Sequence, residues 1–142
     1  MSHAGERRAR IGARRCAVQG LYQWQLAGAA PQDIVREFAA EREVARADLE
    51  YFRTLICDIA KHFDALVASL QPCLDRAWSA VGPVERAILL IGAYELVHCP
   101  EVPRRVVINE AIELAKMFGP EQGHRYINAV LDAFSKTARP AE

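Results

Sequence analysis

The chain has 142 residues, of which 51% are apolar and 25% are charged, and its formal net charge is zero. This is the composition of an ordinary globular domain, and it argues against a disordered chain. No apolar run approaches the roughly 18 residues that a membrane span requires. A chain of this length can also bury a sufficient core without metals or disulfides.

Apolar residues recur at helical spacing along most of the chain, and the alternation typical of half-buried strands does not persist anywhere. In the N-terminal half, this spacing and the placement of glycine and proline predict helices over residues 7–27, 31–40 and 48–70 and a weak helical turn at 74–78. Asp48 is the expected N-cap of the third helix, and Pro72 is expected to end it.

The C-terminal half has sharper boundaries. Its spacing predicts helices over residues 83–98, 104–118 and 121–136, which are separated by Pro100 and Pro103 and then by Gly119 and Pro120. No linker is long enough to divide the chain into independent domains. We therefore expect a single all-α domain.

Two features of the sequence indicate where the protein is located: its cysteines and the segment that follows the first arginines. The four cysteines are widely spaced and form no C-x-x-C pair, so we expect buried free thiols in a reducing compartment. Gln19, Gln23 and Gln25 interrupt the apolar stretch that could otherwise pass for a secretion signal. We expect a cytoplasmic protein with no membrane association.

Catalytic and metal-binding motifs are not evident in the sequence. It contains no glycine-rich phosphate loop, G-x-S-x-G or H-E-x-x-H, and the four histidines have no metal-ligand spacing. His98 and Cys99 come nearest to a reactive pair, but neighbouring residues on a helix point about 100° apart. We expect no enzymatic activity, no metal and no cofactor.

Five arginines lie within nine residues near the N-terminus, where Glu6 is the one acid among the first 15 residues. They are Arg7, Arg8, Arg10, Arg14 and Arg15. On a helix, Arg8, Arg15 and Tyr22 share one stripe because they are seven residues apart. Such arginines can neutralise phosphates, and the ring can stack on an unpaired base. A platform for single-stranded RNA and a solvated basic face with a half-buried Tyr22 both fit this pattern.

Five segments along the chain carry a resemblance to the NusB family of transcription antitermination proteins. In chain order they are RRCAVQGLYQWQL, YFRTLI, ERAILLIGAYEL, INEAIELAKMFG and YINAVLD. The resemblance extends from about Arg7 to Lys136, which is nearly the whole chain.

The resemblance implies a fold and a function. The fold is a compact helical domain, 1–142, of about seven helices arranged as two small sub-bundles, about 7–78 and about 81–136. The function is transcription antitermination: such proteins bind boxA-type single-stranded RNA together with NusE, a small-subunit ribosomal protein. Within the RNA polymerase antitermination complex they support read-through and ribosomal RNA transcription.

The resemblance also implies roles for single residues. In the first helix it places four residues at the RNA, namely Arg10, Arg14, Arg15 and Tyr22. In the C-terminal half, Glu85 and Tyr126 complete the same surface. Ile11 and Gly12 interrupt a basic cluster that is commonly tighter, so Arg7 and Arg8 are also expected to bind RNA. Gly20 stands where the family usually has alanine.

Two alternatives remain open at this point. The chain could be a helical protein–protein interaction module whose arginines contact an acidic partner. It could also be an RNA-binding accessory domain of the kind found in RNA methyltransferases, which would require a catalytic domain with a cofactor-binding glycine motif. RNA affinity measured over a range of salt separates the first alternative from the antitermination factor.

Overall fold

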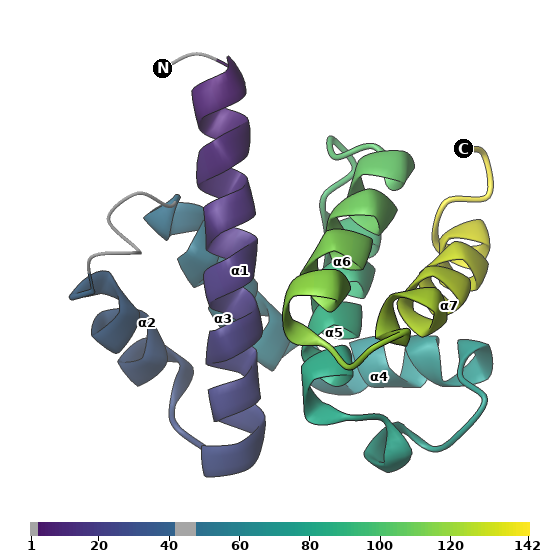
Figure 1. The fold of residues 1–142 in the computed structure, drawn as a ribbon, viewed down its shortest axis with the longest axis horizontal. Helices are drawn as coiled ribbons and strands as arrows, with labels where there is room; N and C mark the ends of the chain where they lie inside the picture. Colours follow the sequence, from purple (N-terminus) through teal and green to yellow (C-terminus); the bar gives the residue numbers. More distant parts are fainter. Residues whose placement is uncertain (1–2, 42–47) are drawn as a thin grey trace. The chain divides into compact units, whose positions relative to one another are not determined.

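The computed structural model describes residues 3–41 and 48–142. Over these residues it contains seven α-helices, two 3₁₀ turns and no strand (Figure 1), which confirms the all-α prediction. The α-helices are α1 (His3–Ala27), α2 (Pro31–Ala39), α3 (Leu49–Lys61), α4 (Phe63–Leu70), α5 (Pro83–His98), α6 (Arg104–Phe118) and α7 (Gly123–Ala138). The 3₁₀ turns are η2 (Gln71–Cys73) and η3 (Trp78–Ala80). None of the helices in this part of the chain is both long and apolar enough to span a membrane.

The first compact unit, Met1–Lys61, is built on α1. This helix packs against α3 and α2, and one of its faces is fully buried through Ala13, Ala17 and Leu21. At Gly20 the two long helices approach closely, because an added Cβ would lie 2.8 Å from Cδ1 of Ile56. The isoleucine therefore occupies the space that an alanine methyl group would need.

The second compact unit, His62–Glu142, is organised around α5. Helices α4, α6 and α7 all contact α5, and every residue from Ala87 to Leu96 is buried. Gly92 allows the closest approach to α7, because a Cβ at this position would lie 2.6 Å from Cδ1 of Leu131. The nearly continuous apolar sequence of α5 is explained by this burial on all sides.

The expected single helix over residues 48–70 is wrong, because the structure divides it into α3 and α4. Its start is confirmed: Oδ1 of Asp48 accepts a hydrogen bond from the Tyr51 amide at 2.9 Å, as an N-cap does. The backbone leaves the helical conformation at His62, with φ −101° and ψ 15°. The His62 ring stacks on His98 with 4.6 Å between the ring centroids.

The two compact units divide at this same break, between Lys61 and His62. The sequence places the boundary between sub-bundles later, at about residues 78–81. The difference arises because α4 packs with α5 and α7. That residues 1–142 act as one domain stays a prediction.

The weak helical turn expected at 74–78 is also wrong, because residues 74–77 form a non-helical loop between η2 and η3. The Gln71 side chain, which precedes this loop, forms two hydrogen bonds to the backbone at its far end. Its amide nitrogen donates to the Arg76 carbonyl at 3.0 Å, and its amide oxygen accepts from the Trp78 backbone N–H at 3.2 Å. Side-chain hydrogen bonds therefore order this loop in place of helical ones.

The C-terminal end of α5 is capped by one arginine from beyond α7. The side chain of Arg139 is 10% exposed, and its guanidinium donates hydrogen bonds to four backbone carbonyls. These belong to Glu95 (3.0 Å), Leu96 (2.9 Å), Cys99 (2.9 Å) and Val102 (2.6 Å). The last carbonyls of a helix have no partners within the helix, so Arg139 satisfies groups that are otherwise costly to bury.

We expect Arg139→Ala to lower the free energy of unfolding by about 3 kcal/mol, because four hydrogen bonds from a charged donor are lost. Chemical denaturation followed by circular dichroism measures this change. Arg36→Ala is the matched control, since Arg36 forms an exposed ion pair with Asp33 at 3.3 Å. It should cost about 0.5 kcal/mol or less. Equal losses in the two variants would refute the capping role of Arg139.

Candidate nucleic-acid interface

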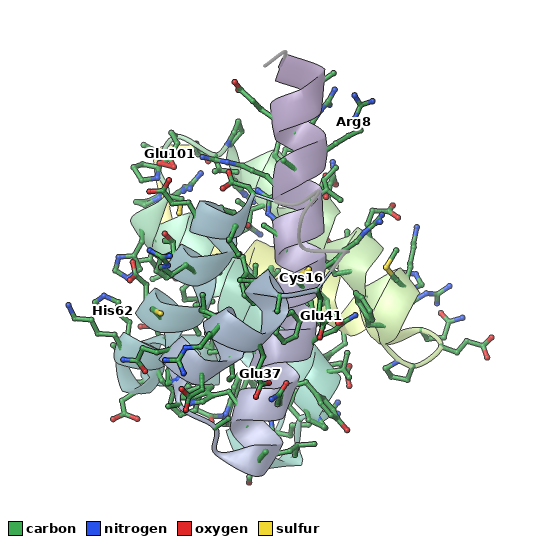
Figure 2. The ribbon with its side chains drawn as sticks, turned by 90° about the vertical axis from the view of Figure 1, so that its left-hand side faces the viewer. Arg8, Cys16, Glu37, Glu41, His62 and Glu101 are labelled. Carbon is green, nitrogen blue, oxygen red and sulfur yellow. The ribbon has the colours of Figure 1, made fainter. Side chains whose placement is uncertain are left out.

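An exposed stripe runs along α1, and we call it the outer stripe of α1. Its exposed members, at spacings that bring them to one side of the helix, are Arg8, Arg15, Gln19, Tyr22 and Leu26. Tyr22 is 40% exposed and Leu26 is 56% exposed. Figure 2 shows Arg8 pointing away from the helix. The predicted common stripe of Arg8, Arg15 and Tyr22 is confirmed, and α1 continues through Gly12 without a break.

Gln19 and Leu26 were not singled out from the sequence. Each lies four residues after a member of the predicted stripe, so the same helical spacing could have identified them. Gln19 adds an amide between Arg15 and Tyr22, and Leu26 extends the apolar surface beside the ring. The outer stripe of α1 therefore changes from basic to aromatic and apolar along its length.

Two of the five arginines lie against a tyrosine of α3. The Arg10 guanidinium carbon is 4.5 Å from the centroid of the Tyr51 ring, and that of Arg14 is 5.7 Å from it. Arg14 is 4% exposed, so the expectation that it belongs to a solvent-facing basic surface is wrong. Its place on the helix turns it toward α3, where cation–π contact with Tyr51 offsets part of the cost of burying the charge. Arg7, Arg8 and Arg15 are exposed, and Arg10 is half-buried.

The second unit contains a cluster of polar side chains around Tyr126, and we call it the Tyr126 cluster. Its members are Asp75, Arg76, Glu85 and Tyr126. The Arg76 guanidinium carbon lies 4.6 Å from the centroid of the Tyr126 ring. The same guanidinium donates two hydrogen bonds to the Asp75 carboxylate, from Nε at 2.7 Å and from Nη2 at 3.1 Å. Arg76 and Asp75 were not identified from the sequence, because a loop has no periodicity that would reveal them.

The electrostatics of the Tyr126 cluster keep its ring neutral. Burial raises the pKa of Tyr126, and the negative charge of Asp75 raises it further. Hydrogen bonding to Arg76 lowers the pKa of Asp75. The Tyr126 hydroxyl is itself buried, and no described residue forms a hydrogen bond of regular geometry with it. The Tyr126 ring faces the Arg76 guanidinium, and its hydroxyl also interacts with the Asp75 carboxylate.

Glu85 is half-buried and lies at the first turns of two helices. An added Cβ on Gly82, the N-cap of α5, would lie 3.0 Å from its Oε1, and one on Gly123, the first residue of α7, 3.5 Å from its Oε2. Helix N-termini favour a carboxylate by about 0.3–1 kcal/mol each. Glu85 and Tyr126 each interact electrostatically with Arg76, and the two helix N-termini provide a structural reason for an acid at position 85.

A groove of about 580 Å³ is lined by residues of α6 and α7, and the sequence did not reveal it. Asn109 and Asn128 are exposed and line this groove. Arg104 and Arg105 line it at the start of α6. The Arg104 guanidinium pairs with Asp132 at 3.0 Å, and this hydrogen bond lowers the pKa of Asp132.

The cysteines and the other potential metal ligands show no reactive or metal-binding arrangement in the described residues. All four cysteines are free, but the burial expected for them holds only for Cys16 and Cys99, because Cys57 and Cys73 are half-buried. Burial raises the pKa values of Cys57 and Cys73, so neither thiol is activated as a nucleophile. Within residues 3–41 and 48–142, no group of three or more potential ligands could hold a metal ion.

These features define the class of the molecule as a small helical protein whose first helix presents an exposed basic and aromatic stripe. The sequence model of the NusB family matches residues 12–136. The chain therefore belongs to the NusB family.

Named relatives and solved structures agree with this assignment. The transcription antitermination protein NusB of Thiobacillus denitrificans is 48% identical over 130 residues, covering 92% of this chain and 90% of the relative. The NusB protein of Alcanivorax borkumensis is 48% identical over 134 residues, covering 94% of this chain and 89% of the relative. NusB of T. maritima has the same fold, with a TM-score of 0.78 at 24% identity, covering 89% of this chain and 90% of that one. A crystal structure of the antitermination factors NusB and NusE in complex with dsRNA contains a chain that matches with a TM-score of 0.77 at 27% identity, covering 92% and 98%.

The two neighbouring arginines of α1 should differ in their effect on stability. Arg14→Ala removes a buried cation from the Tyr51 ring, so we expect it to lower the free energy of unfolding by about 2 kcal/mol. Arg15→Ala removes an exposed side chain and should change that free energy by about 0.5 kcal/mol or less. Urea denaturation of both variants provides the comparison. A loss in Arg15→Ala as large as that in Arg14→Ala would show that the face assignment of α1 is wrong.

Proposed function

We propose that this protein is a transcription antitermination factor that binds boxA-type RNA together with the NusE ribosomal protein. It acts in the cytoplasm by binding rather than by catalysis, as part of the RNA polymerase antitermination complex. In this role it supports transcriptional read-through and ribosomal RNA synthesis.

The outer stripe of α1 is the observation that carries this proposal. Its exposed arginines provide charge for phosphates, and the exposed ring of Tyr22 provides a surface on which an unpaired base can stack. Arg15 and Tyr22 are two helical turns apart, about 10.5 Å along the axis, so one strand can contact both. Side chains cannot read bases in the narrow major groove of duplex RNA. The exposed ring therefore favours single-stranded RNA.

The relatives support the same function from a separate direction. The curated relatives are transcription antitermination proteins, and one solved relative is bound to NusE and to dsRNA. Because that complex contains a duplex, RNA binding should be measured with both single-stranded and double-stranded RNA.

The proposed roles of the individual residues follow their exposure. Arg7, Arg8 and Arg15 bind phosphates, and Tyr22 stacks on a base. Arg10, half-buried against Tyr51, contacts RNA at the edge of this surface, whereas Arg14 contributes by fixing α1 on α3. In the second unit, Glu85 and Tyr126 are the residues proposed to belong to an RNA-binding surface.

A salt titration of RNA binding tests the phosphate contacts. We expect Arg15→Ala to weaken binding of a fluorescein-labelled single-stranded RNA that carries a boxA element. The slope of log K against log salt should become shallower by about 0.7, the value for one phosphate contact on a single strand. Fluorescence anisotropy at four salt concentrations measures both quantities.

Arg36→Ala is the matched control for the loss of one exposed positive charge, and it should bind like the wild type. The same sequence presented as a duplex should bind more weakly than the single strand. If the wild-type protein bound neither RNA, the chain would be a protein–protein interaction module instead. Equal binding of the duplex would contradict the single-strand preference.

Tyr22 separates base contacts from phosphate contacts. Tyr22→Ala should cost about 1–3 kcal/mol in RNA affinity, the range for losing a base-stacking ring. Its salt slope should remain that of the wild type, because no phosphate contact is removed. Tyr22→Phe keeps the ring and should retain most of the affinity. A Phe variant as weak as the Ala variant would assign the effect to the hydroxyl and would rule out stacking.

A further inference from the structure

The geometry points to Arg76 as a base-stacking residue of the RNA site, with Tyr126 as the residue that positions it. This inference rests on the proposed RNA-binding function. It assigns a role to a loop residue that the sequence did not single out. It also changes the role expected for Tyr126, from a direct RNA contact to a support.

Part of the Arg76 guanidinium is already engaged within the protein. Two of its in-plane donors, Nε and Nη2, already bind the Asp75 carboxylate at 2.7 and 3.1 Å. One face of the guanidinium lies over the Tyr126 ring at 4.6 Å. The Arg76 side chain is nevertheless 44% exposed. The Tyr126 ring covers only one face of the guanidinium, and a second planar group can stack on the opposite face.

Charge provides the second step. Besides Arg76, the Tyr126 cluster holds two carboxylates, those of Asp75 and Glu85, so its formal charge is negative. The two carboxylates offset the positive charge of Arg76 and so weaken its attraction for a phosphate, whereas the stacking of an uncharged base does not depend on that charge in the same way. Guanidinium planes stack readily on unpaired RNA bases. The observations thus favour an unpaired base over a phosphate as the ligand.

The third step is that the loop holds Arg76 in place before any ligand binds. The Gln71 amide donates to the Arg76 carbonyl at 3.0 Å and accepts from the Trp78 backbone N–H at 3.2 Å. The Trp78 ring packs edge-on against Phe63, with centroids 6.3 Å apart. The backbone of Arg76 is held by Gln71, and its guanidinium is held by Asp75 and the Tyr126 ring. Arg76 therefore loses little conformational freedom when RNA binds.

Fluorescence anisotropy with the boxA-containing single-stranded RNA, without any protein partner, tests this role. Arg76→Ala should weaken binding about 5- to 150-fold, which corresponds to the loss of one base stack. Its log–log salt slope should equal that of the wild type. Arg76→Lys keeps the charge but loses the plane, so it should bind as weakly as Arg76→Ala. Circular dichroism melting establishes that each variant is folded, and Arg36→Ala is the matched charge control.

A double-mutant cycle tests the positioning role of Tyr126. Tyr126→Leu removes the support, so it should weaken binding when Arg76 is present and add little to Arg76→Ala. Additive losses would overturn this role.

Other outcomes overturn the stacking assignment while leaving the proposed function in place. If Arg15→Ala weakens binding but Arg76→Ala binds like the wild type, Arg76 is not part of the RNA site. Arg76 would instead be a phosphate ligand if Arg76→Lys bound RNA like the wild type and Arg76→Ala had a shallower log–log salt slope. If Arg76→Ala weakened RNA binding only when the ribosomal protein was present, the exposed face of Arg76 would contact that protein and not a base. If the wild type binds no RNA, the proposed function itself fails.

Discussion

Burial of α5 on all sides between Ala87 and Leu96 creates a need for hydrogen-bond donors at its C-terminal end, and Arg139 supplies them. A buried helix cannot leave its last carbonyls to water. A guanidinium, with five donors in a fixed plane, can satisfy several of them at once. Because Arg139 directly follows α7, this cap also fastens the end of α7 to α5. The first turns of α7 carry Tyr126, so the position of the Tyr126 cluster depends on the same packing.

The first helix shows how one residue type serves two purposes within a few residues. Arg14 and Arg15 are adjacent in the sequence, but about 100° of helical rotation separates them. Arg14 is buried beside Tyr51, where it contributes to stability. Arg15 remains in solvent on the outer stripe of α1, where it contributes little to folding and is available to a ligand. A similar division holds for Arg76, whose supported face and exposed face serve structure and binding respectively.

Much of the fold follows from the sequence, because α5 and α6 combine regular apolar spacing with proline at their boundaries, and their bounds agree with prediction. The break at His62 could not be predicted in this way, since the apolar spacing continues through it without glycine or proline. At this break the His62 ring stacks on His98 from another helix, a tertiary contact that the local sequence does not reveal. The burial of Arg14 was missed for a related reason, because a charged residue is expected in solvent until its aromatic partner is located. Arg76 was missed because a hydrogen-bonded loop, rather than a periodic pattern, presents it.

The central claim is that this protein provides part of an RNA site that a NusE-type ribosomal protein completes. The most direct measurement is the affinity for the boxA-containing single-stranded RNA with and without a saturating amount of that ribosomal protein. The footprint on this chain is small, so we predict modest affinity for the protein by itself and an increase of about 5- to 150-fold with the partner, the usual range of coupling between two ligands. The RNA should then tighten binding of the partner by the same factor. Equal RNA affinity with and without the ribosomal protein would contradict the account.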